Sequence, residues 1–382
     1  MRVLMLSKAL VVGAYQRKLE AMATCPDVEL TVAVPLEWRD ERGVTPLERA
    51  HTNGYELIVT PIWLNGYFHL HFYPRFGELL ARVRPDIVHI DEEPYNFATW
   101  HALRLAHRAG AKTLFFSWQN ILRPYPPPFR WLERDVLQRA DAALVGNHAA
   151  AEVWRAKGYA GPIHVIPQFG VDPEIFRPHP LTPSPDRAVR GQERGKGAGG
   201  MGVRFVVGYA GRLVPEKGLD ILLQALVQAP GAQLKILGAG PERRLLNYLT
   251  TRLNLRDRVT ISPLIPSTQM PGFFAQLDCF VLPSRTRPNW KEQFGRVLIE
   301  AMACGVPVIA SDCGELPNVI GDAGLIFSED DVEALAAHLR TLQADPALRA
   351  SLTEKGRARV LAHYTQQRIA EQTVGVYQTL KH

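Results

Sequence analysis

The chain has 382 residues, of which 46% are hydrophobic and 21% are charged, as in an ordinary globular protein. This length allows two domains that each bury a core. No apolar run approaches the roughly 20 residues that a membrane-spanning helix needs. The net charge of +6 divides into +1, +2 and +3 over residues 1–177, 178–203 and 204–382. Nucleic-acid-binding proteins cluster basic residues on one face, so this even division argues against a nucleic-acid partner.

The first residues resemble a secretory signal only briefly. Lys8 interrupts the apolar run, and no small-residue cleavage site follows it cleanly. The four cysteines lack the spacing of metal ligands and stand mostly in apolar stretches; they are Cys25, Cys279, Cys304 and Cys313. We therefore expect reduced thiols and a cytoplasmic protein.

Short β-branched runs alternate with helical patterns along the chain. The runs before residue 177 include RVLMLS, ELTVAV, DIVHI and KTLFFSW, and those after residue 203 include RFVVGYAG, QLKILG, CFVLPS and VPVIAS. Continuous apolar strands separated by helices predict parallel sheets covered on both faces. The two groups predict an α/β protein with two doubly wound, Rossmann-like domains facing each other across a cleft. Ligands are expected at the carboxyl ends of the strands.

Residues 177–203 are rich in proline, glycine and charge, which predicts a linker or mobile loop. This segment separates an N-terminal domain, residues 1–176, from a C-terminal domain, residues 204–362. Residues 363–382 have a helical pattern and no strand after them. This helix must therefore pack on surfaces that are already built, and the N-terminal domain is one of them.

The stretch GYAGRLVPEKGLDILLQAL joins a strand to a helix through glycine and basic residues. The N-terminus of a helix offers unpaired N–H groups, and Arg212 and Lys217 add full positive charges. This arrangement favours a phosphate site. The alternative is that both side chains are surface charges beside a turn. A second junction, LKILGAGPE, is too short for a dinucleotide fingerprint and by itself predicts a tight connection.

The third junction, NWKEQFGRVLIEAMACGVPVIA, places two glutamates close to an apolar helix. A helix that begins near Phe294 would carry its apolar stripe on Val297, Leu298, Ala301 and Met302. Glu300 borders this stripe in the second turn, and Glu292 precedes the helix. A buried carboxylate needs a compensating partner. That partner is either a ligand or Arg296, four residues before Glu300, but an Arg296 pair gives no reason for Glu292.

These motifs, in this order, resemble the retaining glycosyltransferases of family 4, which have the GT-B fold. The resemblance covers nearly the whole chain. It rests on the two glutamates separated by seven residues and followed by AMACGVPVIAS, on GYAGRLVPEKGLDILLQAL, on LGAGPE, on VIPQFGVDPEIFRP and on DIVHIDEEPYNFATWHALRLA. It implies transfer of a hexose-type sugar from a nucleoside diphosphate sugar to a sugar, lipid-linked or small-molecule acceptor, in carbohydrate biosynthesis.

The resemblance also implies roles for the donor-side residues. Glu300 should hold the ribose hydroxyls, and Glu292 the hydroxyls of the transferred sugar. Arg212 and Lys217 should stabilise the leaving diphosphate and act, with Glu292, as catalytic residues. The donor-binding set also includes Gly13 in the first strand–helix loop and the segment Gln293, Phe294 and Gly295. Backbone groups near Leu264 and Ile265 should meet the nucleobase.

The chain departs from the family pattern at two places in the N-terminal domain. The family usually has two glycines where this chain has Gly13 and Ala14. A histidine commonly follows the strand KTLFFSW, where this chain has Trp118, Gln119 and Asn120. We expect these three residues and Glu92 to face the acceptor. His89 is expected to be a packed structural residue.

No Asp-x-Asp pair occurs in the chain, so cationic side chains and helix N-termini are expected to offset the leaving-group charge. We expect no metal ion and no cofactor; Asp91, Glu92 and Glu93 form the competing candidate for a metal site. The segment 120–137 is aromatic and basic, and it could line an acceptor groove, touch the inner face of a membrane or form an ordinary rigid loop. Two rival functions are a nucleotide-sugar epimerase or hydrolase and a non-catalytic sugar-binding module.

Overall fold

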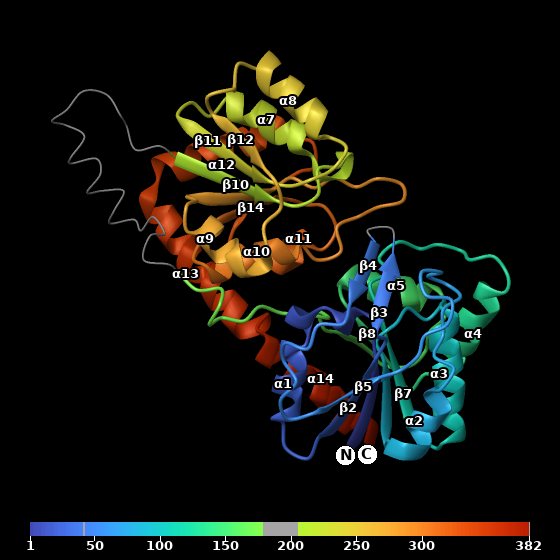
Figure 1. Ribbon diagram of the computed structural model, residues 1–382. Coiled ribbons are helices and arrows are strands. Elements are labelled where there is room, and N and C mark those ends of the chain that lie inside the picture. The colour runs from blue at the N-terminus through green and yellow to red at the C-terminus, as the bar shows by residue number, and fades with distance from the viewer. Residues whose placement is uncertain (41–42, 179–204, 382) are drawn as a thin grey trace. The chain divides into compact units, whose positions relative to one another are not determined.

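The computed structural model describes residues 1–40, 43–178 and 205–381 (Figure 1). These residues form two compact units. Unit 1 contains residues 1–170 and 366–382, and unit 2 contains residues 171–365. The predicted linker, residues 177–203, lies almost entirely outside the described residues.

Unit 1 is built on a seven-stranded parallel sheet. From one edge to the other the strands are β5 (Glu56–Val59), β2 (Glu29–Val34), β1 (Arg2–Leu6), β6 (Ile87–Ile90), β7 (Lys112–Ser117), β8 (Ala142–Val145) and β9 (Ile163–Val165). The chain moves from β1 to β2 on one side and places β6 on the other. The loops after β1 and β6 therefore diverge, which opens a binding position at their carboxyl ends.

Helices cover both faces of this sheet. They are α1 (Arg17–Ala23), α2 (Phe76–Val83), α3 (Phe97–Arg108), α4 (Phe129–Arg139), α5 (His148–Ala156) and α14 (Gln366–Lys381). Alternate residues of β1 point to opposite faces, as the period of a strand requires. Leu4 and Leu6 pack with α2 to α5, whereas Val3 and Met5 pack with α1 and α14.

Two smaller elements complete unit 1. The short 3-10 helices η1 (Ala9–Val11) and η2 (Gly13–Tyr15) connect β1 to α1. An antiparallel hairpin of β3 (Glu37–Asp40) and β4 (Gly43–Pro46) follows β2.

Unit 2 is built on a six-stranded parallel sheet. Its strands, in spatial order, are β12 (Val259–Ser262), β11 (Ala232–Leu237), β10 (Phe205–Ala210), β13 (Cys279–Leu282), β14 (Val308–Ser311) and β15 (Leu325–Phe327). Here β10 lies between β11 and β13, so the strand order reverses at β10. Both sheets confirm the prediction of two doubly wound domains.

The helices of unit 2 are η3 (Pro215–Lys217), α7 (Leu219–Val227), α8 (Arg243–Arg252), η4 (Ser267–Gln269), α9 (Met270–Phe274), α10 (Arg296–Ala303), α11 (Leu316–Ile320), α12 (Val332–Ala344) and α13 (Pro346–His363). Figure 1 shows α7, α8 and α12 on one face of the sheet and α9, α10 and α11 on the other. Helix α7 packs on α12, and α10 packs on α13.

The two units divide at slightly different residues from those expected. The sequence placed the boundaries after residues 176 and 362, whereas the contacts place them after Gly170 and Thr365. The N–H of Val171 donates to the carbonyl of Tyr364 at 2.9 Å, and this hydrogen bond joins the first residue of unit 2 to a residue near its end. The Gln366 side chain donates to the carbonyl of Gly170 at 2.8 Å, and α14 then packs in unit 1.

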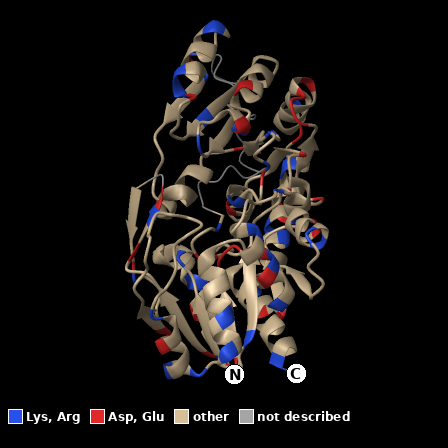
Figure 2. Cartoon of the chain, turned by 90° about the vertical axis from the view of Figure 1, so that its right-hand side faces the viewer, with Lys and Arg blue, Asp and Glu red and all other residues tan. Residues whose placement is uncertain are grey.

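Figure 2 shows basic and acidic residues interspersed along the described part of the chain in both units. Among the described residues, no helix combines the length and the apolar character that crossing a bilayer requires.

Candidate active site

The carboxyl ends of β10 and β13 in unit 2 bring together two of the predicted residues. Lys217 follows β10, and Glu292 lies in the loop after β13. The Lys217 Nζ atom lies 2.5 Å from Glu292 Oε2, and their side chains are 13% and 11% exposed. Ser284 also donates its hydroxyl to Glu292 Oε2, at 2.8 Å. A buried carboxylate with two donors keeps its oxygens in fixed positions.

Two glycines allow the backbone to approach closely enough to build this pair. Gly218 has φ +62°, and a Cβ atom there would lie 2.0 Å from the Pro283 carbonyl oxygen. Gly314 has φ +63°, and its Cβ would lie 2.1 Å from the carbonyl oxygen of Glu292. No other residue type fits either position without displacing the backbone. The loops that carry Lys217 and Glu292 are thus fixed by close backbone packing.

Trp290 is a site residue that sequence reasoning missed. Backbone hydrogen bonds of 2.8 and 3.1 Å join Arg287 and Trp290 in a tight turn. This turn places the indole ring 4.7 Å from Lys217 Nζ, a distance suited to a cation–π interaction. A large aromatic residue two positions before Glu292, in a loop rich in charge, was the available signal.

Arg212 follows the same strand as Lys217, β10. Its guanidinium is 56% exposed and reaches Glu216 at 3.5 Å. The Tyr209 hydroxyl donates to the Arg212 carbonyl at 2.9 Å and fixes the backbone there. Burial, with a contribution from the Glu292 charge, raises the pKa of Tyr209. The Arg212 side chain is therefore accessible from solvent.

Glu300 lies in α10 and is 7% exposed. Its Oε1 atom accepts a hydrogen bond from Arg296 Nε at 2.8 Å, so the ion pair considered from the sequence is formed. Burial raises the pKa of Glu300, and Arg296 opposes this shift. The apolar face of α10 includes Leu298 and Ala301 as expected, whereas Val297 is only half-buried.

The segment before α10 combines exposed and buried groups. Gln293 is exposed, while Phe294 is 7% exposed and its ring lies 5.6 Å from that of Tyr364. Gly295 caps α10 with φ +73°. A Cβ atom there would lie 2.5 Å from a methyl group of Leu316, so glycine is required at the start of this helix.

The junction LGAGPE has a packing role. The Leu213 N–H donates to the Ala239 carbonyl at 2.9 Å, and a Cβ atom at Gly240 would lie 2.3 Å from the Leu213 carbonyl oxygen. The loop after β12 is open, with Leu264 57% exposed and Ile265 half-buried. This loop therefore presents backbone groups and apolar side chains at the same edge of the sheet.

In unit 1, the Gly13 N–H donates to Glu48 Oε2 at 2.7 Å. A Cβ atom at Gly13 would lie 2.7 Å from the Cβ of Ala50, so the chain passes closely over this glycine. The glutamate carboxylate stands in for an anionic oxygen at the Gly13 N–H. In the structure, the N–H of Gly13 is thus paired with a carboxylate of unit 1 itself.

The three consecutive acids after β6 have different partners. Asp91 accepts from the Ser7 hydroxyl at 2.6 Å. Glu92 is completely buried and pairs with Lys8. Glu93 is half-buried and accepts from Ser117, at 2.6 Å. Among the described residues, no group of three histidine, cysteine or acidic side chains is arranged to hold a metal ion.

Lys8 is a second residue that sequence reasoning missed. Its ammonium pairs with Glu92 and lies 5.0 and 4.7 Å from the rings of Trp38 and Phe68. Burial lowers the pKa of Lys8 to about 7, although Glu93 and Asp91 oppose the shift. The available signal was a lysine directly after the first strand.

The expected acceptor-side segment after β7 lies next to these acids. The Trp118 N–H donates to Glu93 Oε1 at 2.8 Å, and its indole N–H donates to Gln168 Oε1 at 2.9 Å. Gln119 is buried and donates to the Ile121 carbonyl, while Asn120 is half-buried. Glu92, Trp118 and Gln119 are thus brought to one edge of the sheet, with Glu92 pointing inward.

His89 lies below this edge, inside unit 1. It is 1% exposed and its Nδ1 atom lies 2.6 Å from the Tyr377 hydroxyl of α14. Burial lowers the pKa of His89 to about 4. The histidine is therefore neutral and structural.

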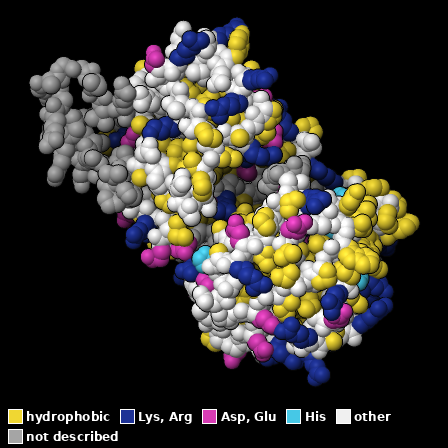
Figure 3. Space-filling view, in the orientation of Figure 1, with side chains coloured by type: hydrophobic (Ala, Val, Ile, Leu, Met, Phe, Trp, Pro, Cys, Tyr) yellow, Lys and Arg dark blue, Asp and Glu magenta, His cyan; other side chains and the backbone are white. Residues whose placement is uncertain are grey.

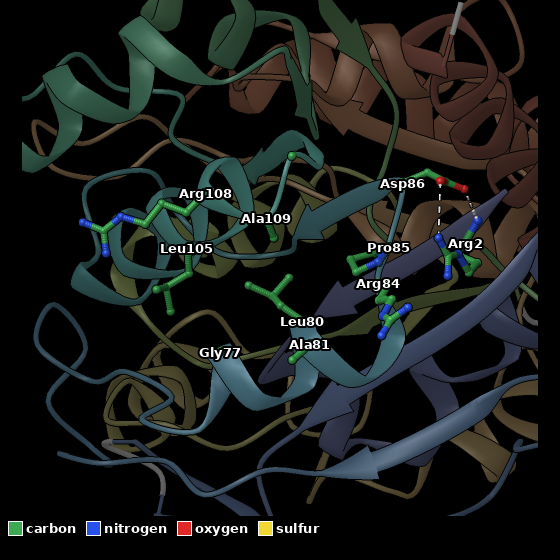
Figure 4. Close-up of a pocket in the computed structure, with 11 residues that line it drawn as sticks. Arg2, Gly77, Leu80, Ala81, Arg84, Pro85, Asp86, Leu105, Arg108 and Ala109 are labelled. Atoms are coloured by element: carbon green, nitrogen blue, oxygen red, sulfur yellow. Dashed lines mark hydrogen bonds and ion pairs between the residues drawn. The ribbon is translucent and has the colours of Figure 1, made fainter.

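A hollow of about 710 Å³ lies elsewhere in unit 1, at the amino-terminal edge of the sheet (Figure 4). Figure 4 shows Arg2 paired with Asp86 near Arg84, with Arg108 on the opposite side of the hollow. Arg84 and Arg108 lie at the C-terminal ends of α2 and α3, where positive charge complements the helix dipole. This position explains the arginines without a ligand, and parallel sheets bind substrates at the opposite edge.

Two parallel-sheet units, each with polar groups at the carboxyl ends of its central strands, define the class of the GT-B glycosyltransferases. Known sequences assign the family. Residues 201–359 match the family model described as glycosyl transferases group 1, and residues 27–175 match the model described as glycosyltransferase family 4. The chain belongs to the family 4 glycosyltransferases, and it is an enzyme of carbohydrate biosynthesis.

One curated relative and two solved structures illustrate this membership. The chain is 32% identical to the GDP-mannose-dependent α-(1-6)-phosphatidylinositol monomannoside mannosyltransferase of Mycolicibacterium smegmatis, over 86% of this chain and 85% of that protein. It shares its fold with sucrose-phosphate synthase from Thermosynechococcus elongatus, with a TM-score of 0.70, 23% identity and coverage of 100% and 99%. It also shares its fold with Anabaena Alr3699/HepE in complex with UDP, with a TM-score of 0.72, 21% identity and coverage of 99% and 100%.

Proposed function

We propose that this glycosyltransferase moves a hexose-type sugar from a nucleoside diphosphate sugar to an acceptor, retains the anomeric configuration and needs no metal ion. The observation that carries the proposal is the Lys217–Glu292 pair at the carboxyl ends of β10 and β13, 2.5 Å apart. An ammonium offsets charge on a leaving diphosphate, and a carboxylate beside it accepts hydrogen bonds from sugar hydroxyls.

The other donor-side residues have supporting roles in this proposal. Arg212 is exposed and adds a second positive charge to the diphosphate. The Gly13 N–H, which donates to the Glu48 carboxylate, would donate to a phosphate oxygen instead. Glu300 would accept hydrogen bonds from the ribose hydroxyls through the carboxylate that Arg296 holds. In this arrangement the ion pair orients Glu300 and does not compete with the ribose.

Three groups have positioning roles. Gln293, Phe294 and Gly295 present the start of α10 to the pyrophosphate, since a helix N-terminus favours anions. Leu264 and Ile265, in the open loop after β12, meet the nucleobase. The mannosyltransferase from M. smegmatis is named for GDP-mannose, so GDP-sugars are the first donors to examine.

On the acceptor side, we propose that Trp118, Gln119 and Asn120 contact the acceptor. The buried Glu92 supports this edge through Lys8. The named mannosyltransferase acts on a phosphatidylinositol mannoside, which supports a lipid-linked acceptor for this chain. The four cysteines are free thiols, which is consistent with a cytoplasmic enzyme at the inner face of a membrane.

A donor screen tests this proposal most directly. UDP-, GDP-, ADP- and dTDP-sugars are compared by thermal unfolding, because a ligand at 100 times its dissociation constant adds about 2.7 kcal/mol to the free energy of unfolding. One nucleotide should stabilise the wild type and not the Lys217→Ala variant. Equal stabilisation of both proteins would exclude Lys217 from the donor site.

The reaction itself is then examined with the donor that binds. NMR of the product should show the same anomer as the donor, and transfer should continue in EDTA. Loss of activity in EDTA with recovery in Mg²⁺ would contradict the metal-independent reaction. Release of free sugar at the same rate with and without acceptor would favour a hydrolase.

A further inference from the structure

Unit 1 exposes an unusual number of large apolar side chains in two of its loops. They are Trp63 at 60%, Leu64 at 50%, Tyr67 at 64%, Phe68 at 43% and Leu70 at 44% in the first loop, and Leu122 at 60% and Trp131 at 62% in the second loop and the helix α4 that follows it. Figure 3 shows hydrophobic side chains gathered on the surface of this unit. Scattered exposed apolar residues are ordinary, but a contiguous patch marks an interaction site.

The two loops form one surface, because His69 joins them. Its ring lies 5.8 Å from the ring of Tyr125 and 5.1 Å from that of Phe129. Tyr125 in turn stacks on Tyr95 at 4.4 Å, and Tyr95 lies 6.5 Å from Phe68. We call residues 63–70 and 122–134 the aromatic–arginine surface.

The exposed charged side chains on this surface are all positive. Neither residues 57–77 nor residues 118–132 contain an aspartate or glutamate. Arg123 is exposed in the second loop, and Arg130 and Arg134 are exposed one turn apart on α4 beside Trp131.

The acidic side chains of α4 are neutralised by other residues. Glu133 is buried and pairs with Lys157 at 2.5 Å. Asp135 pairs with Arg104 at 2.9 Å and with Arg139 at 2.7 Å. The outward face of α4 therefore presents an indole ring between two arginines, with its carboxylates already bound.

We propose that the aromatic–arginine surface binds the surface of an anionic phospholipid bilayer. Tryptophan and tyrosine side chains are favoured at the boundary between headgroups and acyl chains, because one end of each is apolar and the other polar. Arginines are attracted to anionic headgroups, and nothing on the two loops repels them. The charge of the surface complements a bilayer of negative charge.

This surface borders the acceptor side of unit 1. The Phe68 ring lies 4.7 Å from Lys8 Nζ, and Lys8 follows β1 and pairs with Glu92. A bilayer bound here would present a lipid-linked acceptor to the carboxyl edge of the sheet. This assignment of the acceptor class rests on the proposed function, whereas the binding of a bilayer does not.

The experiment sediments the full chain with vesicles of phosphatidylcholine alone and of phosphatidylcholine mixed with phosphatidylglycerol. We expect binding to the mixed vesicles that weakens as salt is raised. The pair Arg130→Gln and Arg134→Gln should weaken binding about fivefold for each arginine. Trp63→Ser with Trp131→Ser should weaken it further. The control, Leu245→Ser with Tyr248→Ser, removes exposed apolar residues of α8 in unit 2 and should leave binding unchanged.

Several outcomes would overturn the proposal. Equal binding to both kinds of vesicle would exclude recognition of negative charge. If no vesicle is bound and a dimer of the wild type dissociates in Trp131→Ser, the surface is an interface between copies of the chain.

The folding of the variants is checked separately. All variants should melt at the wild-type temperature and keep donor-induced stabilisation. Failure of donor stabilisation in the wild type would contradict the proposed function and leave the vesicle result standing.

Discussion

Lys217 and Glu292 are 75 residues apart in the chain, yet the ammonium of one lies 2.5 Å from the carboxylate of the other. Lys217 lies in the connection that follows β10, and Glu292 lies in the loop that follows β13. The contact therefore depends on the pairing of β10 with β13, which is the point where the strand order of unit 2 reverses. The pair joins a group suited to diphosphate with a group suited to sugar hydroxyls.

Removing the positive charge of Lys217 or of Arg212 should lower turnover. Lys217→Ala and Arg212→Ala should each reduce kcat by about 100- to 1,000-fold, or roughly 2.7–4 kcal/mol, by comparison with loss of one oxyanion donor. Steady-state kinetics measure the effect. Arg252→Ala, an exposed arginine of α8, is the control and should behave as the wild type. Near-normal kcat in both site variants would exclude this junction as the phosphate site.

The two glutamates should differ in which kinetic constant they change. Ribose is unchanged during transfer, so Glu300→Gln should raise KM for the donor more than it lowers kcat. The transferred sugar gains positive charge in the transition state, so Glu292→Gln should mainly lower kcat. Wild-type kinetics for Glu300→Gln, together with unfolding of an Arg296→Ala variant, would leave Glu300 a purely structural role.

Trp290 should hold Lys217 through its π-face. Trp290→Phe keeps an aromatic face and should retain much of the activity, whereas Trp290→Leu keeps apolar bulk and should lower kcat about five- to thirtyfold, as loss of a partly desolvated cation–π contact of ~1–2 kcal/mol implies. Steady-state kinetics of both variants separate the effect of the aromatic face from the effect of apolar bulk. Equal activity of the two variants would show that only bulk matters at this position.

Gly314 should be essential for the placement of Glu292. Its Cβ would lie 2.1 Å from the Glu292 carbonyl oxygen, so Gly314→Ala should cost stability by ~1–3 kcal/mol and reduce activity. Denaturant unfolding measures the change. Gly375→Ala is the matched control, since α14 has open space there and alanine should stabilise the helix by about 1 kcal/mol. Unchanged stability in Gly314→Ala would show that the loop can move away.

Glu93 should make stability depend on pH. Burial raises its pKa to about 7, against the opposing effects of Ser117, Trp118, Lys8 and Lys157. The folded protein therefore holds a proton that the unfolded chain releases above its ordinary pKa of 4.5. The contribution of this proton to the free energy of unfolding is complete below pH 4.5. It is lost as pH rises through about 7.

Denaturant midpoints between pH 4.5 and 8 test this prediction. The wild type should lose stability relative to Glu93→Gln across this range, because glutamine has no proton to release. Parallel curves for the two proteins would contradict the raised pKa.

The local structure of this protein follows from short stretches of its sequence. Apolar runs such as CFVLPS and VPVIAS became buried parallel strands, because a strand that is covered on both faces favours a nearly continuous run of apolar residues. Glycines such as Gly218 and Gly295 lie where the backbone has positive φ, a constraint that belongs to the residue itself. The family motifs that contain Arg212, Lys217, Glu292 and Glu300 were likewise readable, because they lie in short continuous stretches.

Which side chains contact one another depends instead on how the strands are arranged in the sheets. The partner of Glu92 is Lys8, 84 residues away, and the ring over Lys217 is that of Trp290. Among three consecutive acids, the structure also decided that Glu92 pairs with Lys8, whereas Glu93 accepts hydrogen bonds from Ser117 and Trp118. Side-chain contacts between loops depend on which strands are neighbours in the sheet. The hydrophobic periodicity of a sequence predicts single helices and strands, but it does not predict the spatial order of the strands. The same reason hides the aromatic–arginine surface, whose two loops join only through packing around His69.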